Sequence, residues 1–271
     1  MLSAFNLMEQ YASAAYCGNN FNSPGDKITC SSGSCPLVES ATTNSLAEFS
    51  KGNTDVTGFV ALDNTNRQII VSFRGSSSIE NWMANLDIKA VNTDICSGCS
   101  AHSGFWRSWS QARDEVLQAV KNACAANPGY SVATTGHSLG GAIATLAAAQ
   151  LRNEGYTVAL YTFGAPRIAS SKLSDYITKQ PGGNYRITHW NDPVPRLPPL
   201  AMSYVHISPE YYIEKTNLKS VTSGDIKVYD GSVNIFKGNG AWLVTDVAAH
   251  LWYFNRIAGC AVKELLGGRG A

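Results

Sequence analysis

A serine between glycines is the first candidate for chemistry in this sequence. Residues 133–142 read ATTGHSLGGA and place Ser138 at the centre of a G-x-S-x-G pentapeptide. This pattern can hold a nucleophilic serine on a sharp turn between a strand and a helix, but serine and glycine are also ordinary turn residues. The choice between nucleophile and plain turn therefore depends on the flanking elements and on partners for the serine.

A nucleophilic serine needs a histidine as general base, and an acid that orients the histidine. When the serine lies on a strand-to-helix turn, the acid follows it in the chain and the histidine comes last. Two of the five histidines come late enough, His206 and His250. His250 is the better base because the aromatic run after it could fix a loop histidine, whereas His206 reads as a hydrogen-bonded strand residue. Three are excluded by order or by a predicted strand: His102, His137 and His189.

Asp192 is the best candidate for the acid. It lies just past a predicted strand, at the edge where parallel strands end, and four prolines stiffen the loop after it. Asp175 reads as part of a solvated helix face, and Asp225 and Asp230 read as turn residues. His250 would then take the Ser138 proton, and Asp192 would stabilise the imidazolium.

Ester chemistry at Ser138 would also need donors for an oxyanion. The backbone N–H of Leu139, directly after the nucleophile, should be one of them. Ser76 follows an early predicted strand and could supply the other through its backbone and its hydroxyl, although a plain turn at Ser76 is an equal alternative. We also expect the His137 side chain to point away from the serine, into the packing beneath the turn.

A short amphipathic helix is predicted directly after Ser76. Ile79, Trp82, Met83 and Leu86 recur at helical spacing, while polar residues take the opposite side. Most such stripes simply face a core. Because this one is short and adjoins the candidate oxyanion loop, it could instead cover the site in water and move aside at a lipid surface.

The elements that must position these residues alternate in type. Strands are predicted at residues 56–62, 68–73, 130–135, 158–163, 185–189 and 226–229, and helices near the amino terminus and at residues 104–126, 142–151 and 170–179. Such alternation is typical of a mainly parallel sheet with crossover helices. We therefore predict the α/β class and a single domain over residues 1–271. In this context Ser138 lies between a strand and a helix, which favours the nucleophile.

Composition narrows the functional class. Apolar residues make up 44% and charged residues 15%, and the net charge of +1 offers no electrostatic footprint for nucleic acid. Any lipid contact must therefore be hydrophobic and local. No apolar run is long enough to span a membrane, and the first residues do not form a signal peptide, so a secreted form would already have lost its leader. No lysine follows the glycines, which argues against a phosphate loop.

The cysteines favour an oxidising compartment. Cys96 and Cys99 have the spacing of a redox motif, but they follow a polar stretch, so a structural loop staple is favoured. Cys30 and Cys35 bracket another loop that a disulfide would rigidify. A zinc site formed by these four cysteines remains an alternative, although no histidine lies near them at ligand spacing. Cys124 lies at helical spacing from buried-type positions and is predicted to be a buried free thiol. A bridge between Cys17 and Cys260, near the two ends, would close almost the whole chain. Three bridges and one such thiol suit an extracellular protein.

Almost from end to end, the sequence resembles the filamentous-fungal class 3 triacylglycerol lipases, most of all the Thermomyces-type lipase. The likeness is carried by residues 14–18, 59–66, 73–76, 78–82, 94–99, 136–142, 164–167, 191–192, 194–199 and 249–254. It is weakest over residues 231–247. Residues 261–271 run past the last family cysteine and are expected to form a flexible tail.

The resemblance implies an α/β-hydrolase fold with the triad Ser138, Asp192 and His250 and with Ser76 and Leu139 as oxyanion donors. It implies a lid over residues 77–86 in which Trp82 matches the family's lid tryptophan. It further implies three disulfides, with Cys124 unpaired: Cys17–Cys260, Cys30–Cys35 and Cys96–Cys99. No cofactor and no metal are implied. We expect a secreted monomer that contacts a lipid surface transiently.

Three functions are compared. The first is a lipase that cleaves acylglycerols, above all triacylglycerols, at oil–water interfaces through an acyl-enzyme on Ser138. The second, on the same fold, is a feruloyl esterase or a phospholipase A1; the apolar lid favours lipid over a polysaccharide-linked ester but does not separate triacylglycerol from phospholipid. The third is a catalytically silent lipid- or glycan-binding protein, which would have no need of Ser138, Asp192 and His250 together.

Overall fold

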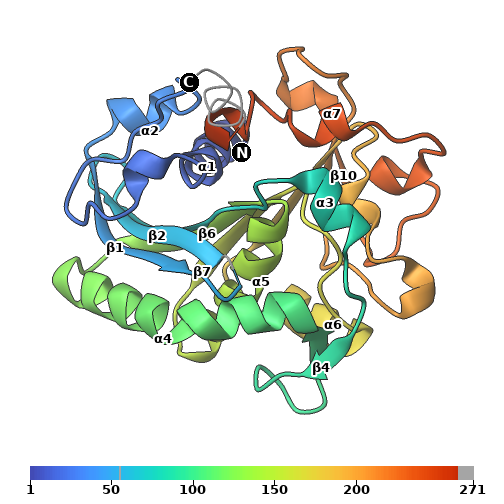
Figure 1. The fold of residues 1–271 in the computed structure, drawn as a ribbon, viewed down its shortest axis with the longest axis horizontal. Helices are drawn as coiled ribbons and strands as arrows, with labels where there is room; N and C mark the ends of the chain where they lie inside the picture. Colours follow the sequence, from blue (N-terminus) through green and yellow to red (C-terminus); the bar gives the residue numbers. More distant parts are fainter. Residues whose placement is uncertain (55, 262–271) are drawn as a thin grey trace.

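A twisted eight-stranded sheet runs through the centre of the protein (Figure 1). The computed structural model describes residues 1–54 and 56–261. In sheet order the strands are β1 (Thr43–Lys51), β2 (Val56–Asp63), β3 (Gln68–Phe73), β6 (Ser131–His137), β7 (Val158–Phe163), β8 (Asn184–His189), β9 (Glu210–Ile213) and β10 (Ile226–Tyr229). Pairing is parallel from β3 through β9 and antiparallel at both edges. The predicted α/β class with a mostly parallel sheet is confirmed.

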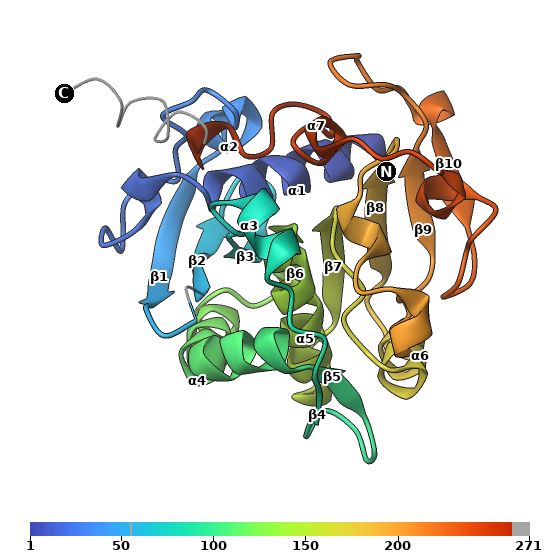
Figure 2. The same ribbon diagram turned by 45° about the vertical axis from the view of Figure 1, so that its right-hand side comes forward.

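Helices cover both faces of this sheet. Long α4 (Ser103–Ala126) and α5 (Leu139–Asn153) lie on one face, and α1 (Leu2–Ala14) lies on the other (Figure 2). The remaining elements are α2 (Pro36–Ser40), α3 (Ile79–Ala84), α6 (Ser171–Lys179), α7 (Val247–His250), a small ribbon of β4 (Ala90–Asn92) and β5 (Ser100–His102), and 3₁₀ turns at Gly18–Asn20, Val194–Arg196, Leu200–Met202, Ser223–Asp225 and Gly238–Ala241. Each face of the sheet therefore has its own apolar core.

Local sequence explains the two helices behind the site. On α4, the buried residues recur every three or four positions and face the sheet: Phe105, Trp109, Ala112, Val116 and Val120. Helix α5 is almost entirely buried because it lies between the sheet and α4, and its alanines allow this close packing. The strand before α5 is buried along nearly all its length, as expected for a central parallel strand.

Two strands of the central sheet were not predicted, nor were β4 and β5 of the small ribbon. β1 has a polar edge-strand sequence, TNSLAEFSK, in which only alternate positions are buried. β9 is four residues long, too short for its apolar pattern to stand out. The predicted strands at residues 68–73, 158–163 and 226–229 coincide with β3, β7 and β10, whereas β6 continues two residues beyond the prediction, to His137.

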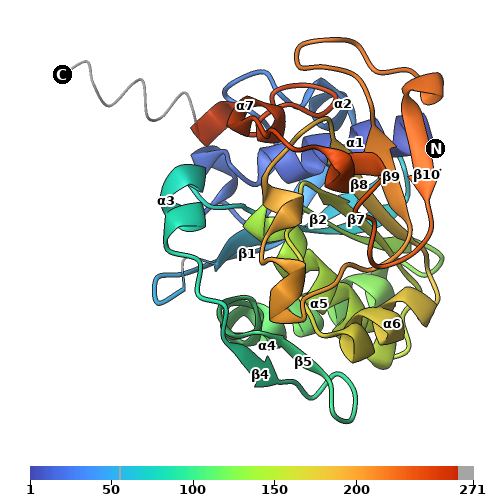
Figure 3. The same ribbon diagram turned by 90° about the vertical axis from the view of Figure 1, so that its right-hand side faces the viewer.

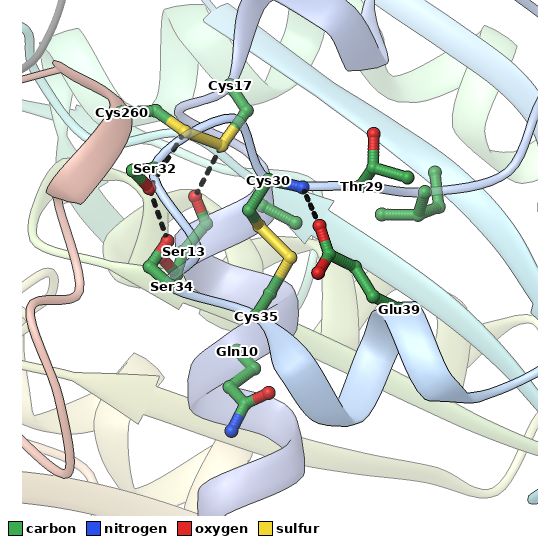
Figure 4. Close-up of a disulfide and its surroundings, with 12 residues drawn as sticks. Gln10, Ser13, Cys17, Thr29, Cys30, Ser32, Ser34, Cys35, Glu39 and Cys260 are labelled. Carbon is green, nitrogen blue, oxygen red and sulfur yellow. Dashed lines mark hydrogen bonds between the residues drawn. A yellow bond between two sulfur atoms is a disulfide. The ribbon is translucent and has the colours of Figure 1, made fainter.

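The structure contains the three disulfides that the family resemblance implies. Cys17–Cys260 joins the end of α1 to the carboxyl-terminal segment, beside Cys30–Cys35 (Figure 4). Within the described residues Cys124 is the one free cysteine, but the prediction that it is buried is wrong. The buried face of α4 passes through Ala123, so Cys124 lies at the margin of that face, partly exposed.

Candidate active site

Ser138 occupies a strained turn between β6 and α5. Its φ of 58° and ψ of −129° are unusual for a residue with a side chain. The flanking glycines are required by space: a Cβ on Gly136 would lie 2.4 Å from the Gly140 backbone, and one on Gly140 would lie 2.1 Å from the carbonyl oxygen of Phe73. The turn is thus held tightly against β3, and strain of this kind is concentrated at functional sites.

Asp192 and His250 meet beneath the surface, although 58 residues separate them. His250 Nδ1 donates to Asp192 Oδ2 at 2.8 Å, and both side chains are fully buried. A neutral imidazole that donates from Nδ1 keeps its lone pair on Nε2. Among the described residues, neither His250 Nε2 nor Ser138 Oγ has a hydrogen-bond partner, although both atoms are buried. His250 Nε2 is therefore free to accept a proton.

Hydrogen bonds hold Asp192 at both carboxylate oxygens and at its backbone carbonyl oxygen. Asp192 follows β8, and its Oδ1 accepts from the backbone N–H of Val194 at 2.8 Å. Its Oδ2 accepts from the hydroxyl of Tyr253, also at 2.8 Å, in addition to His250. Its carbonyl oxygen accepts from the side-chain amide of Asn239 at 2.8 Å. The carboxylate can therefore orient the imidazole without moving itself.

Tyr253 was not foreseen as a site residue. It lies three residues after His250, and the run AHLWYF suggested only aromatic packing. Burial and the Asp192 carboxylate raise the pKa of Tyr253 well above its ordinary value, so its hydroxyl stays protonated and keeps donating. A tyrosine three residues after a histidine is too common a pattern to reveal this contact from sequence.

Gly164 lies against the acid–base pair. A Cβ at this position would come within 2.6 Å of the Tyr253 hydroxyl, 2.8 Å of Asp192 Oδ2 and 2.9 Å of His250 Nδ1. The residue also has a φ of 59°, which favours glycine. It follows β7 directly, so the sheet itself carries the residue that leaves room for the pair.

The His137 side chain is buried in the packing, and its ring lies against that of the base. Its ring is fully buried, and its centroid is 4.3 Å from that of His250. Because a carbonyl oxygen can only accept, His137 Nε2 donates to the backbone oxygen of His250 at 2.8 Å, and Tyr16 then donates to His137 Nδ1 at 2.7 Å. Burial, followed by the neighbouring His250, lowers the pKa of His137 well below its ordinary value. Its Nε2 therefore holds the backbone of α7, and its Nδ1 is occupied by Tyr16.

The other histidines have structural surroundings. His189 Nδ1 donates to the carbonyl oxygen of Ala249 at 2.8 Å, which fixes α7 at a second point. His206 Nε2 donates to the carbonyl oxygen of Pro195 at 2.6 Å, and burial is the main cause of its lowered pKa. His102 caps the amino terminus of α4 through its Nδ1.

The predicted oxyanion donors lie on two sides of Ser138. Leu139 is the first residue of α5, where backbone N–H groups have no partner within the helix. The loop of Ser76 runs beside the serine, because a Cβ on the preceding Gly75 would lie 3.1 Å from Ser138 Cβ. Ser76 lines a cavity of about 220 Å³ together with Tyr16, Ile79 and residues of the α7 region.

The amphipathic stretch is helical, as predicted, over the six residues of α3. Figure 3 shows α3 at the rim of the molecule. Ile79, Trp82, Met83 and Leu86 are each half-buried, and no residue of the helix is fully buried. Trp82 stacks on Phe105 of α4 with ring centroids 6.3 Å apart. The apolar stripe is therefore only loosely covered, as a movable element would be.

In the described part of the chain, no group of three or more histidine, cysteine or carboxylate side chains is placed so that it could hold a metal ion. In the same residues, no helix has both the length and the apolar character needed to cross a membrane.

Comparison with known proteins matches the chain to lipase models over most of its length. The family model for class 3 lipases matches residues 70–202, and the model for the lipase 3 N-terminal region matches residues 2–46. The secreted mono- and diacylglycerol lipase A of Penicillium camembertii is 45% identical over 262 residues, which cover 94% of this chain and 85% of the relative. Secreted mono- and diacylglycerol lipase 1 of Fusarium solani is 41% identical, covering 96% and 78%.

A solved structure agrees with these matches. The crystal structure of the mono- and diacylglycerol lipase from Aspergillus oryzae superposes with a TM-score of 0.92 at 44% identity and covers 96% of this chain and 98% of that one. The likeness therefore extends over both faces of the sheet and over the loops that carry the candidate site.

Proposed function

The chain belongs to the class 3 lipase family, and on this premise we propose that it is a secreted acylglycerol lipase that works through an acyl-enzyme on Ser138. As a member of the family it is a hydrolase of ester bonds, and its relatives are named as secreted lipases. The observation that carries the proposed mechanism is the buried 2.8 Å hydrogen bond from His250 Nδ1 to Asp192 Oδ2, which leaves Nε2 free at the end of the sheet where Ser138 lies.

Each residue has a role in the proposed reaction. His250 Nε2 takes the hydroxyl proton as Ser138 Oγ attacks the ester carbonyl, and the oxyanion is bound by the Leu139 N–H and by Ser76. The imidazolium then protonates the departing glyceride alkoxide, which leaves an acyl-serine. Water attacks that ester with His250 again as base, and the fatty acid and free Ser138 are released. Asp192 orients His250 and stabilises the imidazolium.

In this proposal the substrate is an acylglycerol with long acyl chains. The half-buried stripe of α3 above the Ser76 cavity supports an apolar substrate and a lid that opens at a lipid surface. The sequence predicts triacylglycerols. The names of two relatives at 41% and 45% identity favour mono- and diacylglycerols as a second candidate.

One set of assays tests both the acyl-enzyme mechanism and the substrate class. Hydrolysis rates are measured for emulsified tri-, di- and monooleoylglycerol, for phosphatidylcholine and for a dissolved feruloyl ester, with Ser138→Ala as the control. We expect acylglycerols to be cleaved fastest and Ser138→Ala to be inactive. Equal activity in Ser138→Ala would disprove the acyl-enzyme, and a preference for phospholipid or the feruloyl ester would reject the substrate class. The ratio of tri- to dioleoylglycerol rates decides between the two glyceride candidates.

A further inference from the structure

The loop between β10 and α7 carries an unusual concentration of exposed apolar side chains. Among the described residues, the three most exposed large apolar side chains all lie on it: Leu243 at 98%, Phe236 at 86% and Val244 at 75%. Val233 and Ile235, about half exposed, belong to the same loop. Figure 1 shows this segment, coloured orange to red, leading from β10 into α7. The surface of a soluble protein rarely exposes so many large apolar side chains together unless it binds another molecule there.

The loop is held in place from its inner side. Asn239 is buried and donates to the carbonyl oxygens of Asp192 and Trp190 at 2.8 and 3.2 Å. Trp242 packs on Trp190 with ring centroids 4.8 Å apart and donates to the Tyr212 hydroxyl at 2.8 Å. The outward side chains therefore stand on a fixed base, and their exposure does not come from a missing tertiary contact.

The loop has two apolar limbs, one before and one after Gly238, and the two limbs begin side by side. A Cβ on Gly240 would lie only 1.8 Å from the carbonyl oxygen of Asn234, so the backbones before and after the buried Gly238 touch. One limb carries Ile235 and Phe236, and the other carries Leu243 and Val244. The limbs therefore form one apolar projection.

Charge and position indicate what this projection contacts. From residue 231 to 245, Lys237 is the one charged residue in the sequence. An apolar projection with one flexible cation suits a layer of acyl chains beneath phosphate or hydroxyl headgroups, because the lysine can extend to the polar layer. The loop also continues into Val247, which lines the same cavity as Ser76 and Ile79. A surface that bound this loop would thus lie beside the opening of the candidate site.

We propose that residues 233–244 form a lipid-surface anchor, a preformed loop that inserts Phe236, Leu243 and Val244 into the substrate surface and holds the active site against it. The proposal rests on the proposed function, because it takes the lipid to be the substrate phase. It is separate from α3: the anchor is exposed in the present structure and needs no rearrangement, whereas α3 is half-buried and would have to move.

Binding is tested apart from hydrolysis, in the Ser138→Ala background. The probe is a sucrose-loaded vesicle of phosphatidylcholine with dioleoylglycerol, and partition is measured by sedimentation. Phe236→Ser with Leu243→Ser should lower the partition coefficient at least about tenfold, since two large apolar side chains lose their transfer out of water. The matched control, Leu37→Ser with Leu46→Ser, removes two side chains that are also exposed, at 42% and 37%, from the α2–β1 region and should leave partition unchanged.

Activity assays distinguish a loss of lipid binding by the anchor from a defect in the active site. With Ser138 restored, the anchor double variant should hydrolyse a dissolved short-chain ester at the wild-type rate and emulsified dioleoylglycerol much more slowly. Unchanged partition would overturn the anchor, as would an equal loss on the dissolved ester. Loss of a wild-type dimer in the double variant, seen by sedimentation without lipid, would assign the loop to self-association and also overturn it. If the wild type cleaves no ester, the proposed function fails while partition still tests the anchor.

Discussion

At the scale of single residues, the geometry of the candidate acid and base depends most directly on Gly164. A methyl group there would overlap Tyr253, Asp192 and His250 at 2.6–2.9 Å, and these atoms belong to the hydrogen bonds that orient the imidazole. Gly164→Ala should therefore lower kcat/KM on a dissolved ester at least about a hundredfold, the loss typical of a displacement near 1 Å. The measurement is steady-state hydrolysis by folded protein, checked by circular dichroism.

The control for this variant is Gly155→Ala, at the end of α5. Gly155 also has a positive φ, 92°, but a Cβ there would meet nothing within 4 Å. The strained backbone alone should cost both variants about 1–2 kcal/mol of stability. Gly164→Ala should lose further stability through the overlap, and only Gly164→Ala should lose activity. Full activity in Gly164→Ala would mean that the acid–base pair tolerates displacement, against the tight packing described above.

Order along the chain narrowed the candidates, because the strand-to-helix turn fixes which residue types must follow. The strand predicted before Asp192 and the aromatic run after His250 then selected these two as partners for Ser138. The supporting residues could not be selected in this way. Tyr16 reaches His137 across 121 positions, and Tyr253 reaches Asp192 across 61. No local pattern marks such contacts, since they arise only when β6, β8 and α7 come together at one end of the sheet.

At the scale of elements, the site depends on α7, which is four residues long and could not be stable as an isolated helix. Two neutral histidines, His137 at the end of β6 and His189 at the end of β8, donate to the consecutive carbonyls of His250 and Ala249. Sequence periodicity predicted the long helices well because their apolar faces repeat. It could not predict α7 or β9, whose few residues are fixed by such tertiary contacts.

The carboxyl-terminal segment beyond α7 is tied to α1 by Cys17–Cys260, whose sequence separation of 243 is far larger than the 3 of Cys96–Cys99. In the chain-entropy model, removing the long-range bridge by Cys17→Ser with Cys260→Ser should cost up to about 5 kcal/mol, and removing the short one about 2 kcal/mol. Urea unfolding of the two double variants measures the difference. Equal losses would show that native-state contacts, not loop closure, set the contribution of the long bridge.

At the scale of the whole molecule, four buried histidines couple the fold to pH. Burial is the first cause of a lowered pKa at His102, His137, His189 and His206, each with an ordinary value of 6.5. Below pH 6.5 the unfolded chain binds protons at these positions that the folded chain does not, so the free energy of unfolding should fall as the pH falls. Glu9 acts in the opposite direction, because burial raises the pKa of its carboxyl and the folded chain takes up that proton first.

His206→Gln isolates one of these contributions. Glutamine can still donate to the carbonyl oxygen of Pro195 but does not titrate, whereas His206 lies near Arg186 and Arg167, which lower its pKa further. Any packing loss in the variant is the same at every pH. The difference in unfolding free energy should therefore be constant above pH 6.5 and shift in favour of the variant by about 1.4 kcal/mol per pH unit below it. Urea titrations between about pH 8 and pH 5 measure this difference. If it stayed constant over the whole range, His206 would bind its proton equally well in the folded and the unfolded chain, and the lowered pKa of the buried ring would be wrong.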